Sequence, residues 1–492
     1  MKPLTVVARF TPGPSSEGAL RSLAGSPLVD ALLLASPEPI DPTMAGARLL
    51  PGESLQSGRT LDIVLDAART PYLLLLPDGA PESIGPRALE RMIGAAQSTG
   101  SGIVYSDYHE SGKETQVLHP LCNYQPGSVR DDFDFGAMLL FSVSAARKAR
   151  ETYGPVPDVR FAGLYDLRLK VSIDSPVTHL PEALYSLPAR AAGPAAGERL
   201  FAYLDPRNNT AQKEMEQVFT DYLKRIGAYV PGSRLKPFDA GRMPFPVEAS
   251  VIIPVRNRKE TIAEAAASGL SQKTTFPFNV IVVDNHSTDG TTSVLRKLAA
   301  RNPTLHHVVP GRTGLAIGGC WNEALRSAAC GRYAVQLDSD DLYRTPHVLQ
   351  QIVDTLRDGS YAMVIGSYTL VDFTLEEIAP GLIDHREWTG GNGHNNALRV
   401  NGLGAPRAFA TAVMRETGFP DVSYGEDYAA CLRICREYKV GRIYESLYLC
   451  RRWRGNTDSG LDLDAANRNN AFKDGVRTAE ILARQKMSRA AG

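Results

Sequence analysis

This 492-residue chain is poor in cysteine and carries no net charge. Its six cysteines form no CxxC pair, which argues against a disulfide framework or a zinc site and favours a reducing compartment. The 54 basic residues equal the 54 acidic ones, so neither nucleic acid nor an anionic membrane surface is expected as the main partner. No apolar run is long enough for a transmembrane helix, and the start, MKPLTVVARF, lacks the apolar core of a signal sequence. We therefore expect a cytoplasmic protein without a transmembrane segment.

The length and the pattern of apolar residues predict two α/β domains. A chain of 492 residues exceeds one ordinary hydrophobic core. Residues 1–190 alternate short apolar runs with helical patterns, which is typical of a mainly parallel sheet flanked by helices. A linker over 191–248 contains a helix at 210–226, and a second domain covers 249–470. A last helix, at 471–492, is expected to pack along this second domain.

Three carboxylates follow the apolar run YAVQL directly: Asp338, Asp340 and Asp341. The run is typical of a buried strand, and in an open α/β sheet the carboxyl ends of the strands face the ligand crevice. Carboxylates this close repel one another unless a cation sits among them, and oxygen ligands suit Mg²⁺ or Mn²⁺ that carries a substrate's phosphates. A solvated acidic turn after a strand fits the same residues.

Two more sites carry acids at the ends of expected elements. Asp284 ends another apolar strand, and two neighbouring parallel strands with acids at one edge indicate a nucleotide crevice. Glu426 and Asp427 stand just before an amphipathic helix. Such a pair can cap the helix and complement its dipole, or it can supply a general base.

Four motifs occur in order in the second expected domain, between Ala249 and Asn470: SVIIPVRNR, VIVVDNHSTDGT, YAVQLDSDD and GFPDVSYGEDYAACLR. This set resembles the family 2 glycosyltransferases of the GT-A fold. The resemblance implies an inverting transfer of a sugar from a nucleotide-diphosphate sugar, typically a UDP-sugar, to an acceptor hydroxyl. It also implies a divalent metal, Mn²⁺ or Mg²⁺, as the cofactor.

The resemblance further implies where a nucleotide sugar would bind. Pro254 and Arg256 lie in the family's first nucleotide loop, and Asp284 matches the acid that contacts the base, typically uracil. Asn322 is expected to contact the donor as well, although Trp321 stands where an arginine is common ahead of it.

By the same resemblance, Asp338 and Asp340 form the DxD pair, with Asp341 beside them. One of these acids would contact the ribose and another the metal, for which Asp340 and Asp341 are the expected ligands. Asp427 matches the family's catalytic base, and Glu426 is its neighbour. A base must take the proton of the acceptor hydroxyl as it attacks the anomeric carbon, while the metal stabilises the charge that grows on the diphosphate.

The late loop CRRWRGNTDSG departs from the family's pattern. Arg454 takes the place where the family often carries a histidine that helps to hold the metal or the diphosphate. Arginine does not ligate metals in the usual way, but its planar guanidinium can bind a phosphate.

The acceptor is expected to meet a glycine- and asparagine-rich loop, Asp384 to Phe409, which contains Trp388 and His394. Loops of this composition often close over a substrate. Trp388 could stack on a sugar face, or it could anchor the loop.

The first domain resembles a second copy of the same fold without its acids, so that the chain would hold two tandem, Rossmann-like GT-A domains. Aligned on the second domain, it has Pro77, Gly79 and Ala80 in place of the three acids after the strand, and Gly163 and Leu164 in place of the Glu–Asp pair. Such a domain could dock the acceptor, mediate a homodimer or only support the second fold.

Asp131, Asp132 and Asp134 of the first domain are candidates for a contact surface, or are turn and capping residues.

Two other functions fit parts of the pattern. A sugar nucleotidyltransferase shares the α/β frame and the metal acids, but it usually opens with a glycine-rich basic loop, which VIIPVRNR is not. A non-catalytic carbohydrate-binding or scaffold protein would not need the acids that the second domain retains.

Overall fold

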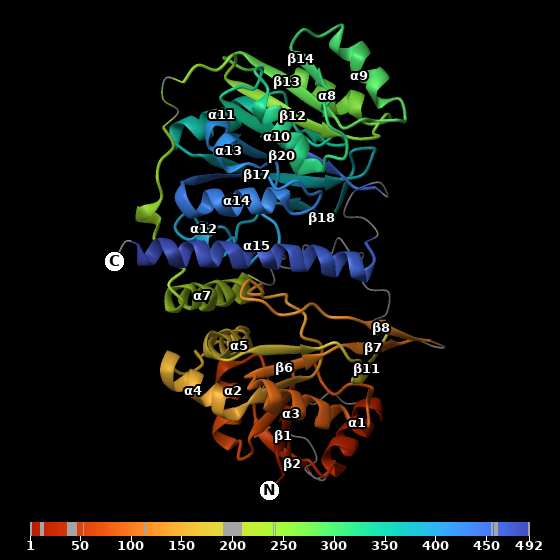
Figure 1. Cartoon of the computed structure of the whole chain (residues 1–492), viewed down its shortest axis with the longest axis vertical. Coiled ribbons are helices and arrows are strands. Elements are labelled where there is room, and N and C mark those ends of the chain that lie inside the picture. The colour runs from red at the N-terminus through yellow and green to blue at the C-terminus, as the bar shows by residue number, and fades with distance from the viewer. Residues whose placement is uncertain are drawn as a thin grey trace. The chain divides into compact units, whose positions relative to one another are not determined.

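The structure is a computed structural model that describes residues 2–9, 14–36, 47–52, 54–112, 115–189, 209–239, 241, 243–453, 456 and 461–490. These residues fall into two compact units (Figure 1). The first unit contains the described residues up to 189 together with 209–229 and 461–490, and the second contains those from 230 to 456. No helix in this described part of the chain has the length and apolar character needed to cross a membrane.

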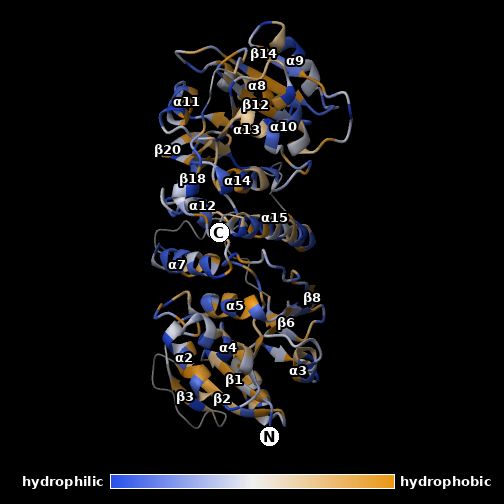
Figure 2. Ribbon diagram, turned by 60° about the vertical axis from the view of Figure 1, so that its left-hand side comes forward, coloured by the Kyte–Doolittle hydropathy of each residue, from blue (hydrophilic) through white to orange (hydrophobic). Residues whose placement is uncertain are grey.

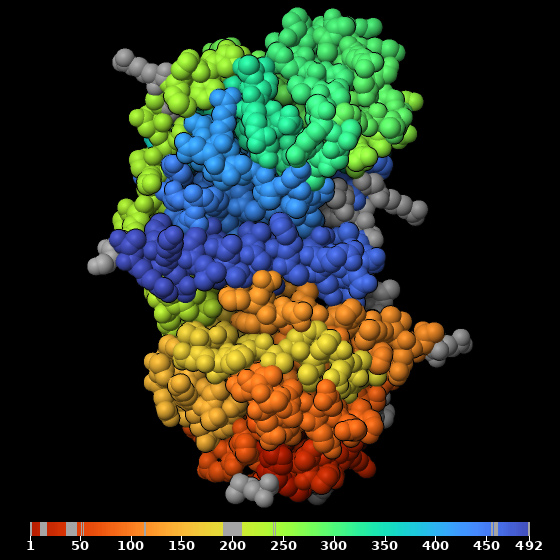
Figure 3. Space-filling model, in the orientation of Figure 1, coloured from red at the N-terminus to blue at the C-terminus, as the bar shows by residue number. Residues whose placement is uncertain are grey.

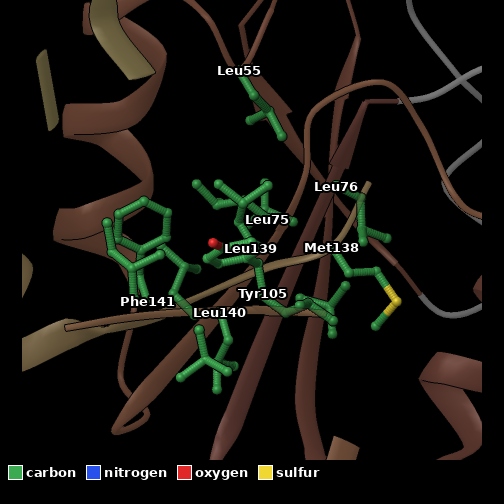
Figure 4. Packing of buried hydrophobic residues seen from close by; sticks show 14 of the residues in the cluster. Leu55, Leu75, Leu76, Tyr105, Met138, Leu139, Leu140 and Phe141 are labelled. Atoms are coloured by element: carbon green, nitrogen blue, oxygen red, sulfur yellow. The ribbon is translucent and has the colours of Figure 1, made fainter. Parts of the chain in front are cut away.

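A seven-stranded sheet forms the centre of the first unit, with the strand order β10-β6-β9-β4-β1-β2-β3. Its strands are apolar runs whose side chains form one buried core, and residues of β4, β6 and β9 such as Leu75, Tyr105 and Leu140 pack together there (Figure 4). The strands are β1 (Leu4–Arg9), β2 (Val29–Ser36), β3 (Arg48–Pro51), β4 (Tyr72–Leu76), β6 (Ile103–Ser106), β9 (Leu139–Ser142) and β10 (Val177–Leu180).

Helices and a small second sheet complete the first unit. The small sheet has the order β5-β11-β7-β8, from β5 (Ser83–Ile84), β7 (Tyr108–Ser111), β8 (Gln116–His119) and β11 (Tyr185–Pro188). The helices are α1 (Pro14–Gly25), α2 (Gly58–Ala67), α3 (Ala88–Thr99), α4 (Val143–Tyr153), α5 (Gly163–Asp174), α7 (Asn209–Arg225) and α15 (Leu463–Arg489).

The second unit is built on a nine-stranded sheet with the order β14-β13-β12-β15-β19-β17-β20-β16, and β18 pairs with β17. Its strands are β12 (Ala249–Val255), β13 (Phe278–Asp284), β14 (Leu305–Val308), β15 (Tyr333–Gln336), β16 (Leu342–Tyr343), β17 (Met363–Val371), β18 (Glu377–Ile383), β19 (Arg407–Ala410) and β20 (Val440–Arg451). Its helices are α8 (Ile262–Leu270), α9 (Thr291–Ala299), α10 (Ile317–Arg326), α11 (Val348–Asp358), α12 (Gly393–Asn396), α13 (Thr411–Thr417) and α14 (Glu426–Glu437). Hydrophobic residues are concentrated in the strands, β1 and β12 among them (Figure 2). The expected class, α/β with sheets flanked by helices, is confirmed.

The two main sheets share one strand order. Reading from β3 to β10 in the first and from β14 to β20 in the second, each has four parallel strands, one antiparallel strand and two further strands that run parallel to each other. The register agrees as well, because Leu4 faces Tyr72 on β4 while Ala249 faces Tyr333 on β15. The sequence alignment likewise sets Tyr72 on Tyr333, and that the first unit is a copy of the second stays a prediction.

A glycine contact recurs in both units. The N–H of Gly58, at the start of α2, donates to the carbonyl of Val159 (2.9 Å), and that of Gly318 in α10 donates to Val422 (3.1 Å). A Cβ on either glycine would lie 1.8 Å from a proline carbonyl oxygen, Pro157 or Pro420 respectively, so only glycine fits. Each proline begins a Pro-Asp-Val segment. In the second unit this contact places α10 against the start of α14.

The C-terminal helix differs from the expectation. It begins earlier, at Leu463, and clusters with the first unit, and atoms of this helix lie on the face that Figure 3 shows. The Gln125 amide donates to the carbonyl of Ala471 (3.0 Å), and the Ser128 hydroxyl donates to the carboxylate of Asp474 (3.0 Å). Asp474 is fully buried and needs such partners, which lie about 350 residues earlier in the chain. Proximity in sequence was therefore a poor guide to where this helix packs.

The helix expected at 210–226 is present as α7, but it is part of the first unit and not of a separate linker. The carboxylate of Glu214 accepts from the N–H of Phe161 (2.7 Å), and Arg225 pairs with Asp166 (3.6 Å). The second unit correspondingly begins near Val230, ahead of the expected boundary at 249.

We expect Gly318→Ala to lower the stability of the second unit by about 3 kcal/mol, because the new methyl group meets backbone and the helix must shift. Gly269→Ala, in α8, is the matched control, since its Cβ would lie 3.5 Å from the nearest atoms, which is an ordinary van der Waals contact. Thermal unfolding of both variants checks this, and equal midpoints for the two would contradict the close approach.

Candidate functional site

The carboxylates that follow β15 lie in a largely buried setting. The N–H of Asp338 donates to the hydroxyl of Tyr448 (2.7 Å), and its carboxylate accepts from the Gln336 amide (3.0 and 3.1 Å). Asp340 and Asp341 are 8% and 4% exposed. Burial, followed by the charge of Asp340, raises the pKa of Asp338, and burial with the charges of both neighbours raises the pKa of Asp341 well above its ordinary value. Asp338 and Asp341 are therefore costly to hold charged without a cation.

The donor chemistry of this cluster fits a divalent ion. Within the described part of the chain no three His, Cys, Asp or Glu side chains form a complete metal cage. Mg²⁺ and Mn²⁺ need no such cage, since one or two carboxylates suffice when phosphates and water supply the remaining oxygens. Asp340 and Asp341, whose charges repel each other, are the residues that could hold the ion.

Glu426 and Asp427 open α14 behind Gly425, which has a φ of +80°. Burial, together with the adjacent charge of Asp427, raises the pKa of Glu426 to about 8. Its Oε2 is buried and has no hydrogen-bond partner among the described residues. The Asp427 side chain is more open, 28% exposed, and its Oδ2 lies 2.6 Å from a guanidinium nitrogen of Arg407.

Arg407 was not predicted from the sequence, yet it connects the two groups of acids. It lies on β19, beside β15, and its N–H donates to the side-chain oxygen of Gln336 (3.1 Å). Burial disfavours its charge, but the charges of Asp427 and its neighbours, Asp338 included, raise the pKa of Arg407 above its ordinary value. Only the antiparallel pairing of β19 with β15 reveals this link, because some 70 residues separate the strands in sequence.

Asp284, expected to contact the base, is fully buried at the end of β13. Its carboxylate accepts from the N–H of Ser287 (3.0 Å), the hydroxyl of Thr292 (2.6 Å) and the ring of His307 (3.2 Å). Although burial opposes it, these hydrogen bonds lower the pKa of Asp284. The side chain thus holds the loop between β13 and α9, and its contact with a base stays a prediction.

The other expected donor residues lie on three segments. Pro254 is in β12, and Arg256 is exposed just beyond that strand. The side-chain amide of Asn322 donates to the carbonyl of Phe419 (2.8 Å) and accepts from the N–H of Phe419 (2.9 Å). The ring of Trp321 packs on the ring of Phe419. Asn322 therefore fixes the segment that leads to α14. Arg454 lies outside the described residues.

Trp388 and His394, the expected acceptor residues, are both buried, at 6% and 3% exposure. The Trp388 ring packs so closely on Gly393 that a Cβ there would lie 2.2 Å away, and Arg442 lies over the ring (5.9 Å). His394 bonds to the carbonyl of Val230 (2.7 Å). A cavity of about 10 Å³ beside Trp388 holds at most a water molecule. These contacts fit the loop-anchor alternative, not stacking on a sugar.

Comparisons with known proteins agree with the motifs. Residues 250–419 match the family model described as Glycosyl transferase family 2. The chain is 34% identical over 100 residues to the uncharacterized protein Rv1520 of Mycobacterium tuberculosis, covering 20% of this chain and 29% of that protein. It is 40% identical over 96 residues to the uncharacterized glycosyltransferase YfnE of Bacillus subtilis, covering 20% and 24%. The matches thus span less than a third of these relatives.

Two solved structures show a distant likeness. One is S. aureus TarS 1-349 in complex with UDP-GlcNAc, at 20% identity and a TM-score of 0.36, covering 48% of this chain and 72% of that one. The other is the mannosyltransferase PcManGT from Pyrobaculum calidifontis in complex with GDP-Man and Mn²⁺, at 20% identity and a TM-score of 0.34, covering 60% and 87%. The family match lies within the second unit, and residues 250–419 of this chain are thus similar to the glycosyl transferase family 2 model.

Proposed function

We propose that the second unit is an inverting glycosyltransferase that moves a sugar from a nucleotide-diphosphate sugar, with UDP as the expected nucleotide, to an acceptor hydroxyl. One observation carries the proposal. The acids after β15 and the acids that open α14 are joined through Gln336 and Arg407, in a domain of this family. The acids that would bind the sugar donor and the base that would act on the acceptor hydroxyl can therefore serve one reacting centre.

The donor would bind at the carboxyl end of β15. Asp340 and Asp341 would hold Mn²⁺ or Mg²⁺, which when bound stabilises the negative charge that develops on the departing diphosphate. Asp338, hydrogen-bonded to Gln336 and Tyr448, is fixed beside them for a ribose contact. Arg256, exposed after β12, can reach a phosphate.

Asp427 is the proposed general base. Its pairing with Arg407 favours the ionised carboxylate, whereas Glu426, with a pKa of about 8, keeps its proton at neutral pH. Asp427 takes the proton of the acceptor hydroxyl as that oxygen forms a bond to the anomeric carbon. The bond from this carbon to the diphosphate oxygen breaks, and its electron pair leaves with the diphosphate. Attack from the face opposite the leaving group inverts the configuration.

We propose that the first unit is a non-catalytic copy of this fold. Since Tyr72 faces Ser142 as Tyr333 faces Ala410, Leu139 takes the place of Arg407. Leu164 is the aligned counterpart of Asp427. The two residues that match the Arg407–Asp427 ion pair are thus both apolar. This is expected, because either charge buried without its partner would cost several kcal/mol.

Asp427→Asn should reduce transfer roughly 10²–10⁴-fold while leaving nucleotide binding nearly unchanged, because it removes the base and not the donor site. The measurement is nucleotide release from whichever UDP-, GDP- or dTDP-sugar the wild type accepts, with binding followed by calorimetry. Asp354→Asn, on α11, is the control. Turnover retained in Asp427→Asn rules out the base assignment.

Asp340→Ala should weaken metal-dependent nucleotide binding by at least about tenfold, since it removes an oxygen ligand. Calorimetry of UDP, GDP and dTDP with and without Mn²⁺, on the full chain, measures this and identifies the nucleotide. Donor affinity indifferent to the substitution would show that the metal site is misplaced.

Glu426→Gln should flatten the pH dependence of stability. Between about pH 4.5, the ordinary pKa of this group, and about pH 8, folded Glu426 holds a proton that the unfolded chain has released. The unfolding free energy of the wild type therefore falls as pH rises through this window, and glutamine removes that contribution. Urea unfolding at pH 5, 6.5 and 8 tests this, with the exposed Glu416→Gln as the control. Equal slopes in wild type and Glu426→Gln would refute it.

A further inference from the structure

The acids after β15 are held from one side by the end of β20. The N–H of Arg451 donates to Oδ1 of Asp341 (2.8 Å), and its Nε donates to the backbone carbonyl of Asp340. The Arg451 side chain is 1% exposed and pairs with Glu264. The backbone at Asp340 and one oxygen of Asp341 are thus fixed by a residue 110 positions later.

Among the residues that the structure describes, the partners of the Asp340 carboxylate contact one of its two oxygens. Oδ2 accepts from the indole N–H of Trp453 (2.9 Å) and from the amide of Asn456 (3.5 Å), and the Nε of Arg258 lies 3.8 Å from it. Oδ1 accepts no hydrogen bond from the residues that the structure describes. The described donors therefore all approach Oδ2, although either oxygen could accept.

The indole of Trp453 is itself held in place. The ring of Phe373 meets it edge-on, with centroids 5.5 Å apart, and the guanidinium of Arg258 lies over it at 5.5 Å. Its backbone N–H donates to the side chain of Asn456 (2.6 Å). The direction of the indole N–H is therefore fixed by packing and by hydrogen bonds, as a group that orients a ligand requires.

We propose that Trp453 is a positioning residue for Asp340: by binding Oδ2, it presents Oδ1 as the single oxygen that Asp340 offers to a divalent cation. This inference rests on the proposed function, which assigns the cation to Asp340. An oxygen that already accepts hydrogen bonds is a poorer metal ligand than its free neighbour. The positive Arg258 also lies on the Oδ2 side, so a cation at Oδ1 is kept away from it.

The test is Trp453→Phe in the full chain, which removes the N–H and leaves a smaller aromatic ring beside Phe373 and Arg258. Mn²⁺ affinity is measured by electron paramagnetic resonance of free Mn²⁺, in the presence of UDP or GDP, whichever gives metal-dependent heat. We expect Mn²⁺ to bind roughly 10–100-fold more weakly, with thermal unfolding unchanged. A role in packing alone predicts no change.

Tryptophan emission gives a second readout without turnover. Paramagnetic Mn²⁺ at Oδ1 should quench Trp453, and the quenching should disappear in Trp453→Phe but persist in Trp321→Phe, whose indole is buried against Phe419. Trp321→Phe also controls for the loss of a tryptophan.

Asp340→Asn separates the two proposals. If Asp340→Asn abolishes Mn²⁺ binding while Trp453→Phe leaves it unchanged or strengthens it, the positioning role is overturned and the metal site stands. If Asp340→Asn has no effect on Mn²⁺, the cation is not at Asp340, and the proposed donor site fails together with the positioning role.

Discussion

The buried negative charge of several acidic side chains is the constraint on which the second unit depends. Burial raises the pKa values of Asp341 and Glu426, and the charges of neighbouring acids raise them further. A fold can tolerate such a cluster only if fixed positive groups or protons offset it. Here both occur, because Glu426 favours its protonated form and Arg407 pairs with Asp427.

The cations near the acids come from distant parts of the chain. Arg258 follows β12 and Arg407 is on β19, whereas Arg451, at the end of β20, pairs with Glu264 and holds Asp341 through its backbone N–H. These residues reach the acids because the sheet order places β12 and β19 on either side of β15, and because β20 ends beside the segment Asp338–Asp341. Charge balance and strand order are therefore linked in this unit. In the first unit the strand order from β3 to β10 is the same, and by the proposed alignment Leu139 stands at the place of Arg407.

Much of the fold was predictable from the sequence, because strands such as β4 and β15 are short apolar runs ended by polar or turn residues. The alignment of Tyr72 with Tyr333 followed from the same pattern, and the register agrees with it. The place of α15 was not predictable, since the partners of Asp474 belong to a loop near the start of the chain.

The candidate site was only partly predictable. Acids at strand ends stand out in a sequence, whereas Arg407 and Trp453 contact them across the sheet and leave no local signal. Asp284 and Asn322 carry the expected residue types and make hydrogen bonds inside the protein, and their contacts with a donor stay predictions. The spacing of residues in the sequence identifies candidate site residues. Their tertiary contacts decide which of their atoms remain available to a ligand.

The first unit is discontinuous, and this bears on the order in which the protein folds. Its chain leaves after Tyr229, the whole second unit follows, and the first unit resumes near Leu461 with α15. On a ribosome, the strands and helices of the second unit emerge completely before α15 is made, so the second unit can finish folding while the first still lacks a helix. Until then the polar groups that Asp474 satisfies, such as the hydroxyl of Ser128, remain without that partner. The first unit is thus the last to be completed. A chain that ended before α15 would lack a helix of the unit that contains its N-terminal residues.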